Sequence, residues 1–397
     1  MSHPAKKLLV LTSRFPYPLE KGDKLRLYRQ IQYLSRRFNI VLVSLTERGL
    51  QDDHLEALRP LCTNIHCIEI SRSGYLLNAI KGIWRGWPLQ IAYFYSAKAA
   101  KEVHRILKQE APDYIYCQLI RMAPYLPETD RLMAIDYMDA FSMRAARRAE
   151  LSGWMGWFWK YQARLLRAFE ANVGGKFPIK YVIAESDQLH LEKAGVESLQ
   201  ILSNGVDAEY FRPHPETKKD VDVAFVGNMS YYPNAQAAQY LVNEIVPILR
   251  SFRKNLKVLI AGASPTRKVR KLSERDVIVT GHLEDIRDAY ARSKVVVAPI
   301  FAGSGQQNKI LEAMAMEVPC ITTVPVGKAI GVSSDLVPVA ESAAEFARLA
   351  NQFLDNPELR NKVGDLSRKF VLQHFNWDAC CRPLLLITKE ETVLENG

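Results

Sequence analysis

The residues of this 397-residue sequence whose types and spacing favour chemistry gather in one glycine-containing segment of the second half. A strand-forming run ends at Pro299, Gly303 and Gly305 follow, and a helical pattern begins near Gln307. The backbone N–H groups of such a loop converge with the N-terminus of the helix, where partial positive charge attracts anions. The segment therefore predicts a site for a diphosphate.

Two ionisable side chains follow in the predicted helix. Lys309 and Glu312 are three positions apart, so they lie on nearly the same face of that helix. A lysine at this place supplies the positive charge that a bound diphosphate requires. Each residue also has a plain alternative, a surface lysine in one case and a solvent-exposed glutamate in the other.

The elements that position this segment alternate between strands and helices along the whole chain. In the first half, the run 6–12 predicts a buried strand, a loop with Pro and Gly follows it, and a helix carries apolar residues over 27–38. Further strand-like runs are separated by segments of helical length, and they lie at 39–45, 65–70, 114–117, 132–136 and 181–184. This alternation predicts a parallel sheet that is covered by helices on both faces.

The same alternation restarts after a Pro- and charge-rich stretch at 211–220, which is typical of a connection between domains. The second half then predicts a helix at 236–249 and strands at 222–227, 256–262, 277–281 and 295–299. In doubly wound sheets, ligands bind beyond the carboxyl ends of the strands. Two facing α/β domains are therefore expected to place the site in the cleft between them.

Several short motifs stand in a characteristic order along the chain. The most specific is 298–315, and the others lie at 203–207, 211–213, 225–234, 261–265, 281–285 and 375–377. Together they resemble the retaining, GT-B-fold sugar transferases of glycosyltransferase family 4, and within them a bacterial subgroup associated with exopolysaccharide assembly. The resemblance covers nearly the whole chain.

The resemblance implies an α/β protein of the GT-B class, with two facing, doubly wound, Rossmann-like parallel-sheet domains and a cleft between them. Residues 1–204 are expected to bind the acceptor and residues 205–377 the nucleotide sugar, while 378–397 cross back to the first domain. The implied activity is that of a hexosyltransferase, which moves a hexose from a nucleotide sugar with retention of the anomeric configuration. Neither a metal nor another cofactor is implied.

The resemblance also assigns roles around the glycine-containing loop. Glu312 occupies the place of the second glutamate of the family's pair, which accepts hydrogen bonds from the ribose hydroxyls of the donor. Where the family usually has the first glutamate, beside the donor sugar, this chain has Ser304. Ser304 is thus expected near the reacting sugar, and the backbone amides of Gly303, Gly305 and Gln306 are expected to bind sugar hydroxyls.

A second departure concerns the basic pair that often binds the diphosphate in the family. Gly227 and Asn228, at the end of the first strand of the second domain, are expected at the donor phosphates, and Asn234 lies near the place of the usual lysine. Lys309 is the expected substitute, a catalytic residue that stabilises the leaving diphosphate. An oxygen of that diphosphate then assists deprotonation of the acceptor hydroxyl on the same face.

Three residues of the first half are candidates by the same resemblance. Gly22 lies in the loop after the first strand, where the family lets backbone approach the phosphate, although an ordinary turn glycine also fits. Gln118 aligns with a histidine near the transferred sugar in many relatives, and its amide can hydrogen-bond a sugar but cannot transfer a proton. Asp139 is a candidate carboxylate on the acceptor side, or the N-cap of a following helix.

The formal net charge of +10 is concentrated in the first half, where residues 1–200 carry 29 Lys and Arg against 20 Asp and Glu. One basic cluster forms a helix with an aromatic stripe and adjacent cations, namely Trp154, Trp157, Lys160, Arg164 and Arg167. Such a helix is suited to an anionic membrane surface, or else packs its aromatic face on its own domain. A similar basic and aromatic stretch lies at 76–95. Together, the two stretches favour a lipid-linked or glycan acceptor, and a place of action at the cytoplasmic, inner face of the cell membrane.

Composition limits the remaining classes of function. The start of the chain lacks the apolar core of a signal peptide, and no run approaches the roughly 18–20 apolar residues of a spanning helix. The six cysteines show no metal-binding spacing, so reduced thiols are expected. The pair Asp220 and Asp222 directly precedes a strand, so no metal site is expected there. No nucleic-acid-binding module accompanies the basic charge, so no nucleic-acid partner is expected. The rival prediction is a non-catalytic, membrane-associated scaffold that kept the GT-B fold.

Overall fold

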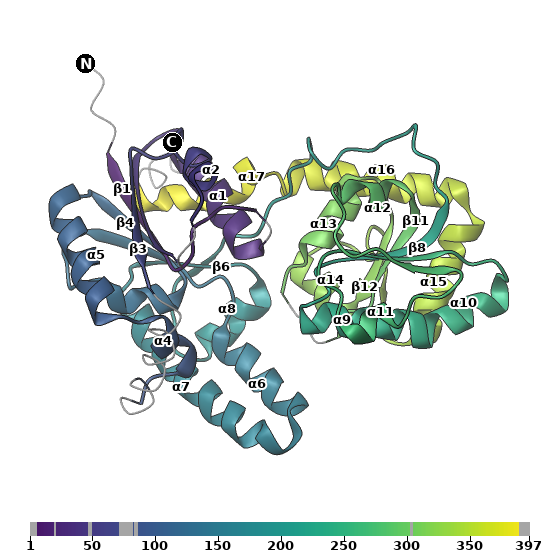
Figure 1. Ribbon diagram of the computed structural model, residues 1–397, viewed down its shortest axis with the longest axis horizontal. Helices are drawn as coiled ribbons and strands as arrows, with labels where there is room; N and C mark the ends of the chain where they lie inside the picture. The colour runs from purple at the N-terminus through teal and green to yellow at the C-terminus, as the bar shows by residue number, and fades with distance from the viewer. Residues whose placement is uncertain are drawn as a thin grey trace. The chain divides into compact units, whose positions relative to one another are not determined.

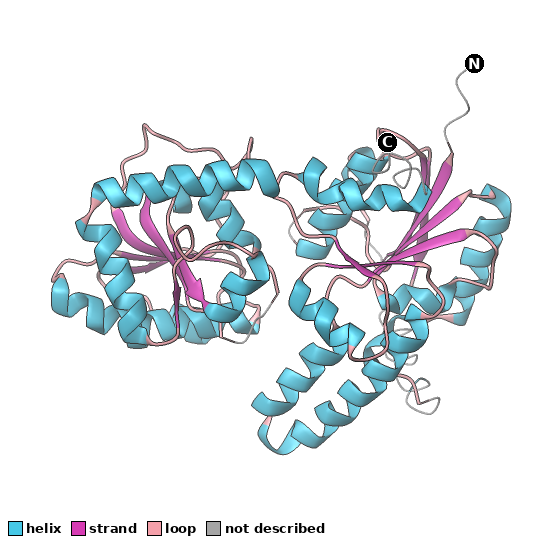
Figure 2. Cartoon of the chain, turned by 180° about the vertical axis from the view of Figure 1, so that it is seen from behind, coloured by secondary structure: helices cyan, strands magenta, loops and turns pink. Residues whose placement is uncertain are grey.

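The structure is a computed structural model that describes residues 6–19, 21–46, 50–70, 82, 86–301 and 305–388. The chain divides into two compact units, unit 1 of residues 1–203 with 381–397 and unit 2 of residues 204–380 (Figure 1). Each unit has its own sheet and its own helices (Figure 2). Across the described ranges, no helix combines the length and the apolar character that crossing a bilayer requires.

The sheet of unit 1 forms because short apolar runs become buried on both faces, as residues 8–11 of its central strand show. Its strand order is β3-β2-β1-β4-β5-β6-β7, with parallel pairing throughout. The strands are β1 (Lys7–Thr12), β2 (Asn39–Thr46), β3 (Asn64–Glu69), β4 (Tyr114–Gln118), β5 (Leu132–Asp136), β6 (Ile179–Val182) and β7 (Leu199–Ile201).

Helices pack on both sides of this sheet (Figure 2). They are α1 (Gly22–Leu34), α2 (Asp52–Glu56), α4 (Leu89–Phe94), α5 (Ala97–Glu110), α6 (Phe141–Leu151), α7 (Gly156–Gly174) and α8 (Glu185–Glu192), with the shorter turns η1 (Ile120–Tyr125), η2 (Gly153–Met155) and η4 (Arg382–Thr388). Helices α6 and α7 pack against one another as a hairpin that projects away from the sheet (Figure 1).

Unit 2 repeats the plan with a six-stranded parallel sheet in the order β10-β9-β8-β11-β12-β13. Its strands are β8 (Val221–Val226), β9 (Val258–Ala261), β10 (Val277–Val279), β11 (Ser293–Ala298), β12 (Cys320–Thr323) and β13 (Val339–Ala340). Its helices are α9 (Tyr232–Tyr240), η3 (Leu241–Ile245), α10 (Val246–Phe252), α11 (Arg267–Arg270), α12 (Arg287–Ala291), α13 (Asn308–Ala315), α14 (Val324–Ile330), α15 (Ala343–Asp355) and α16 (Pro357–His374), with α17 (Trp377–Cys381) at the return to unit 1.

The predicted α/β class with two parallel sheets is confirmed, and each strand run named from the sequence has a counterpart strand. Three further strands, β7, β12 and β13, lie outside the prediction, and they are two to four residues long. The single helix expected at 236–249 is instead a continuous helical stretch from α9 through the π-helical turn η3 to α10. The cleft expected between the domains stays a prediction.

Carboxylates from other helices hold the N-terminus of α6. Asp187 on α8 accepts a hydrogen bond from the N–H of Ala140 (2.9 Å), and Glu170 on α7 accepts one from the N–H of Ser142 (3.0 Å). Both carboxyl groups are buried, and burial raises the pKa of Glu170 to about 7 and that of Asp187 to about 6. The second oxygen of Glu170, Oε2, has no hydrogen-bond partner within the described ranges. Burial therefore makes the charged forms of these two groups more costly in the folded state than in the unfolded chain.

Glu170→Gln is expected to raise the free energy of unfolding at pH 8 by about 1–3 kcal/mol and to change it little at pH 5. The reason is that a carboxyl group with a raised pKa in the folded state destabilises the fold progressively as pH rises from its unfolded value, near 4.5, to about 7. Urea denaturation at both pH values measures this difference, with the exposed Glu150→Gln as the matched control. A variant that is less stable than the wild type at pH 8 would contradict the account.

Candidate functional site

The strand order of unit 2 reverses between β8 and β11, and ligands of open α/β sheets bind beyond the carboxyl ends of strands at such a reversal. The chain after β8 enters a loop at Gly227 and continues into α9, whereas the chain after β11 leads to α13. Helix α13 begins at Asn308 with Gln307 as its N-cap residue, as predicted. Helices α9 and α13 therefore both follow the strands of this reversal.

Lys309 of α13 is buried, with 8% of its surface exposed. Its ammonium donates a hydrogen bond to Oδ1 of Asn234 on α9 (2.5 Å) and lies 5.0 Å from the centre of the Phe225 ring. Burial lowers the pKa of Lys309 to about 8, and the negative charge of Glu312 opposes that shift. The alternative of a surface lysine is wrong.

The loop after β8 is built around this ammonium. A Cβ atom on Gly227 would lie 2.8 Å from Nδ2 of Asn234 and 3.2 Å from Nζ of Lys309, so a side chain there would displace one of these groups. Asn234 donates through Nδ2 to the carbonyl of Asn228 (2.9 Å), while the side chain of Asn228 accepts from the N–H and the hydroxyl of Ser230. Gly227 and Asn228 therefore shape the loop that holds the lysine, and their contact with donor phosphates stays a prediction.

Glu312 lies one turn further along α13 and is half-buried. Its Oε2 accepts a hydrogen bond from the hydroxyl of Tyr290 on α12 (2.6 Å), and Tyr290 is fully buried with its ring edge-on to that of Phe211. Burial raises the pKa of Glu312, whereas the Tyr290 hydroxyl and the charge of Lys309 oppose that shift. The alternative of a freely solvated glutamate is wrong, and Tyr290 is a residue of the site that the sequence reasoning missed.

The prediction that Gly303 and Ser304 contact the donor falls on residues outside the described ranges. Gly305 is half-buried, and the neighbouring Gln306 is buried. Gln306 accepts from the N–H of Asn204 through Oε1 (2.7 Å) and donates to its carbonyl through Nε2 (2.8 Å). The side chain of Gln306 therefore ties this loop to the first residue of unit 2, and the role of its backbone amide stays a prediction.

Two candidates of unit 1 have different surroundings from those expected. Gly22 is the first residue of α1 and not a loop residue, and a Cβ atom there would meet nothing within 4 Å. Gln118 is buried, accepts from the hydroxyl of Thr12 (2.8 Å) and donates to the carbonyl of Asp23 (3.0 Å). The amide of Gln118 thus positions the start of α1, and direct contact with a sugar stays a prediction.

Asp139 follows β5 and forms an ion pair with Arg144 of α6 (3.1 Å). The alternative in which Asp139 caps this helix is wrong, because Ala140 is the N-cap residue and the first N–H groups are bound by other carboxylates. Its role on the acceptor side stays a prediction.

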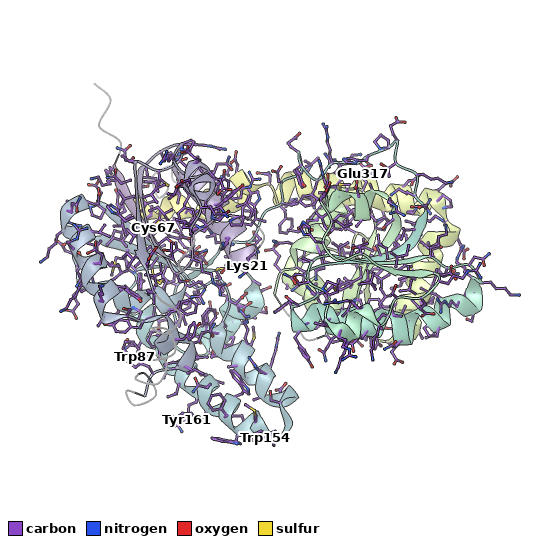
Figure 3. All side chains as sticks on the ribbon, in the orientation of Figure 1. Lys21, Cys67, Trp87, Trp154, Tyr161 and Glu317 are labelled. Carbon is purple, nitrogen blue, oxygen red and sulfur yellow. The ribbon has the colours of Figure 1, made fainter. Side chains whose placement is uncertain are left out.

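The aromatic stripe of the first half lies on the hairpin of α6 and α7. Trp154 in η2 is 84% exposed, Trp157 is 69% exposed and Tyr161 is 52% exposed. Figure 3 shows Trp154 and Tyr161 on this hairpin. The alternative in which these side chains pack on their own domain is wrong, because the buried face of α7 consists of other residues, namely Gly156, Gln162, Leu166, Glu170, Val173 and Gly174. Of the similar stretch at 76–95, residues 76–81 and 83–85 lie outside the described ranges.

The Asp220 and Asp222 pair is engaged in ion pairs. Asp220 accepts two hydrogen bonds from Arg292 (2.9 Å each), and Asp222 accepts one from the ammonium of Lys294 (2.8 Å). Within the described part of the chain, no group of three or more His, Cys, Asp or Glu side chains is placed to hold a metal ion.

Gly262→Ala is expected to lower the free energy of unfolding by about 2–4 kcal/mol. Gly262 follows β9 with a φ of +136°, and a Cβ atom there would lie 2.0 Å from the carbonyl oxygen of Gly227. Because that neighbour is backbone, the loop beside Lys309 must move. Urea denaturation measures the loss, and Gly281→Ala, with positive φ but open space around it, is expected to lose only about 1 kcal/mol. Equal losses in both variants would show that the clash has no effect.

Comparison with known proteins shows a similarity of the part of the chain that carries this site. Residues 220–356, which lie within unit 2 and include Lys309 and Glu312, match the family model of glycosyl transferases group 1. Residues 220–356 are therefore similar to a group 1 glycosyltransferase domain. The matched residues include β8 and β11, the two strands between which the strand order reverses, and helix α13.

The chain is similar over nearly its whole length to solved structures. One is the crystal structure of Anabaena Alr3699/HepE in complex with UDP. The match covers 98% of this chain and 100% of the HepE chain, with a TM-score of 0.68 and 14% identity. Another is WaaG, a glycosyltransferase involved in lipopolysaccharide biosynthesis. That match covers 96% of this chain and 99% of the WaaG chain, with a TM-score of 0.67 and 16% identity. The GT-B fold expected from the motifs is confirmed.

In sequence, the chain is 18% identical over 386 residues to an uncharacterized 44.6 kDa protein in the cps region of Klebsiella pneumoniae. The match covers 93% of this chain and 96% of that protein. The resemblance to GT-B glycosyltransferases of the exopolysaccharide-associated group is thereby confirmed.

Proposed function

We propose that the chain is a glycosyltransferase that moves a hexose from a UDP-sugar to a lipid-linked or growing polysaccharide acceptor, with retention of the anomeric configuration. The observation that carries the proposal is the buried ammonium of Lys309 beside the half-buried carboxylate of Glu312, at the strand-order reversal of the unit whose residues 220–356 match group 1 glycosyl transferases. A nucleoside diphosphate needs a cation for its phosphates and an acceptor for its ribose hydroxyls. These two side chains offer both.

In the proposed mechanism, Lys309 stabilises the charge that develops on the leaving diphosphate. Its pKa of about 8 leaves most of the side chain protonated at pH 7, and its burial makes the attraction to phosphate stronger than in water. The N-terminus of α13 adds partial positive charge, so the proposal includes no metal ion. An oxygen of the departing diphosphate accepts the proton of the acceptor hydroxyl on the same face of the sugar.

Similar proteins support the choice of a UDP-sugar as donor and a glycan as acceptor. HepE is described in complex with UDP-glucose, which supports a UDP-sugar donor. WaaG is described as involved in lipopolysaccharide biosynthesis, and the relative from Klebsiella pneumoniae lies in a cps region. Both support an acceptor that is a lipid-linked or polysaccharide glycan.

Mass spectrometry of reaction products tests this proposal. The purified chain is incubated with a panel of nucleotide sugars and a bacterial membrane extract, and products are compared with those of heat-treated protein. We expect one UDP-sugar to give a product heavier by one hexose, with release of UDP. If the folded chain neither transfers nor hydrolyses any donor of the panel, the proposal is overturned in favour of the non-catalytic scaffold.

The proposed place of action is the inner face of the cell membrane, and the hairpin of α6 and α7 supports it. Trp154 and Tyr161 extend into solvent at this hairpin (Figure 3). The neighbouring cations Lys160, Arg164 and Arg167 are exposed as well. Exposed tryptophan beside lysine and arginine suits the interface of a bilayer with anionic lipids.

Sedimentation with vesicles tests the membrane proposal. Trp154→Ala combined with Trp157→Ala is expected to weaken binding to vesicles of 70% phosphatidylcholine and 30% phosphatidylglycerol about tenfold or more. Phe252→Ala, an exposed aromatic residue on α10 of unit 2, serves as the matched control and leaves binding unchanged. Wild-type binding by the double variant would exclude the hairpin as the membrane contact.

A further inference from the structure

Lys309 and Glu312 carry opposite charges on nearly the same face of α13, yet neither a hydrogen bond nor an ion pair joins them in the described part of the chain. Each is bound instead by an uncharged side chain from another helix. The amide of Asn234 on α9 accepts from Lys309 (2.5 Å), and the hydroxyl of Tyr290 on α12 donates to Glu312 (2.6 Å). Such neutral partners hold the two side chains without cancelling their charges.

The hydroxyl of Tyr290 is a lasting donor to the carboxylate. It lies 2.6 Å from Oε2 of Glu312 and 3.5 Å from the carbonyl oxygen of Lys309. A phenolic hydroxyl has one proton to donate, and the shorter distance assigns that proton to Glu312. Burial and the negative charge of Glu312 raise the pKa of Tyr290 well above its ordinary value, so the hydroxyl keeps its proton.

Packing fixes the place from which this hydroxyl donates. Tyr290 is fully buried, and its ring lies edge-on to that of Phe211, with 6.2 Å between the ring centres. The carbonyl of Phe211 in turn accepts from Nη1 of Arg368 on α16 (3.1 Å), a helix that packs against α13. A donor held in this way orients its acceptor at little further cost in conformational entropy.

The two oxygens of Glu312 have different surroundings. Oε2 is bound to Tyr290, whereas Oε1 has no hydrogen-bond partner within the described ranges. Oε1 is also absent from the buried polar atoms that lack a partner there, so it is accessible. One oxygen is therefore held by the protein, and the other is open to a ligand.

We propose that Tyr290 is a positioning residue for the donor, one that directs the open oxygen of Glu312 at the ribose hydroxyls. The inference rests on the proposed glycosyl transfer and adds a residue to its donor site. A hydrogen bond to the charged form of a carboxyl group also favours that form, and an ionised carboxylate is the stronger acceptor. Without the hydroxyl of Tyr290, Glu312 turns more freely and gains a proton more readily.

The titratable and charged groups around Glu312 come from its own helix and from the elements beside it. They are Lys309 on α13, Tyr290 on α12, Cys320 on β12, and Arg368 on α16 with its ion-pair partner Glu317 (3.8 Å). Burial raises the pKa of Cys320, so its thiol stays neutral. Of these groups, Tyr290 is the one that hydrogen-bonds Glu312 within the described ranges.

Calorimetric titration of Tyr290→Phe with two nucleotides tests this inference. One is UDP, and the other is 2′,3′-dideoxyuridine diphosphate, which lacks both ribose hydroxyls. At pH 7 we expect the variant to bind UDP about tenfold more weakly and the dideoxy nucleotide as tightly as the wild type does. Tyr240→Phe is the matched control and leaves both affinities unchanged, because the hydroxyl of Tyr240 has no hydrogen-bond partner within the described ranges.

The pH dependence of UDP binding separates positioning from a loss of packing. The hydroxyl of Tyr290 lowers the pKa of Glu312, so its removal raises that pKa, by about one unit. Protonated Glu312 is the weaker acceptor. The affinity of the variant relative to the wild type is therefore expected to fall further as pH decreases from 8 to 5, whereas a loss of packing lowers it equally at every pH.

Three results in a wild type that binds UDP would overturn the inference alone. The first is equal affinity of Tyr290→Phe and the wild type for UDP at every pH. The second is a matching loss for both nucleotides, which would show that Tyr290 does not act through the ribose. The third is a loss of UDP affinity that does not change with pH. A folded wild type that binds neither nucleotide contradicts the proposed function itself.

Discussion

Lys309→Met lowers the turnover number for sugar transfer by about 10²–10³-fold. Methionine is similar in length and suits the buried place beside Phe225, so the fold is retained while the charge that faces the leaving diphosphate is lost. Initial rates at saturating donor and acceptor measure the effect. Lys328→Met, which changes an exposed lysine on α14, is the control and leaves the rate unchanged.

The pH dependence of the same reaction gives an independent check. The wild-type kcat/KM for the donor is expected to fall as pH rises through about 8, because this ratio reports on the free enzyme, in which Lys309 loses its proton there. The methionine variant has no proton to lose at this position, so its residual rate lacks that fall. A wild-type turnover number in the variant, or an alkaline fall that persists in it, would remove Lys309 from the mechanism.

Glu312→Ala weakens the binding of UDP about 10²-fold or more. The carboxylate is the proposed acceptor for the ribose hydroxyls, and its removal takes away the shorter of the two hydrogen bonds of the buried Tyr290 hydroxyl. Glu312→Gln keeps an acceptor oxygen but loses the charge, so an intermediate loss of affinity is expected. Isothermal titration calorimetry with UDP measures all three proteins.

Glu216→Ala, an exposed glutamate before the first strand of unit 2, is the matched control for these titrations. Its affinity for UDP is expected to equal that of the wild type. Circular dichroism establishes that Glu312→Ala is folded, since the loss of a half-buried carboxylate removes no apolar packing. Wild-type affinity for UDP in a folded Glu312→Ala variant would show that the nucleotide binds elsewhere.

The fold was largely predictable because its central strands are continuous apolar runs between helices of ordinary length. The run 6–12, for example, became β1, which is buried on both faces at the centre of its sheet. The short strands β7 and β13 were not predicted, because their sequences lack the continuous apolar run that marks β10, which is also short. Pairing with longer neighbours, and not their own sequence, makes them strands.

The site was predictable only where its residues are local. Lys309 and Glu312 share one helix that follows a glycine-containing loop, so their spacing alone places them together. Tyr290 and Asn234 come from other helices than α13. Asn234, on the helix after β8, meets α13 because β8 and β11 are neighbours in the sheet. Such a meeting depends on the strand order, which no local spacing encodes.

The most direct test of the central claim is a crystal structure of the complex with UDP-glucose. We expect the ammonium of Lys309 within hydrogen-bond distance of the diphosphate, and the carboxylate of Glu312 accepting hydrogen bonds from the ribose hydroxyls. A nucleotide bound with its diphosphate and ribose away from both side chains would contradict the account.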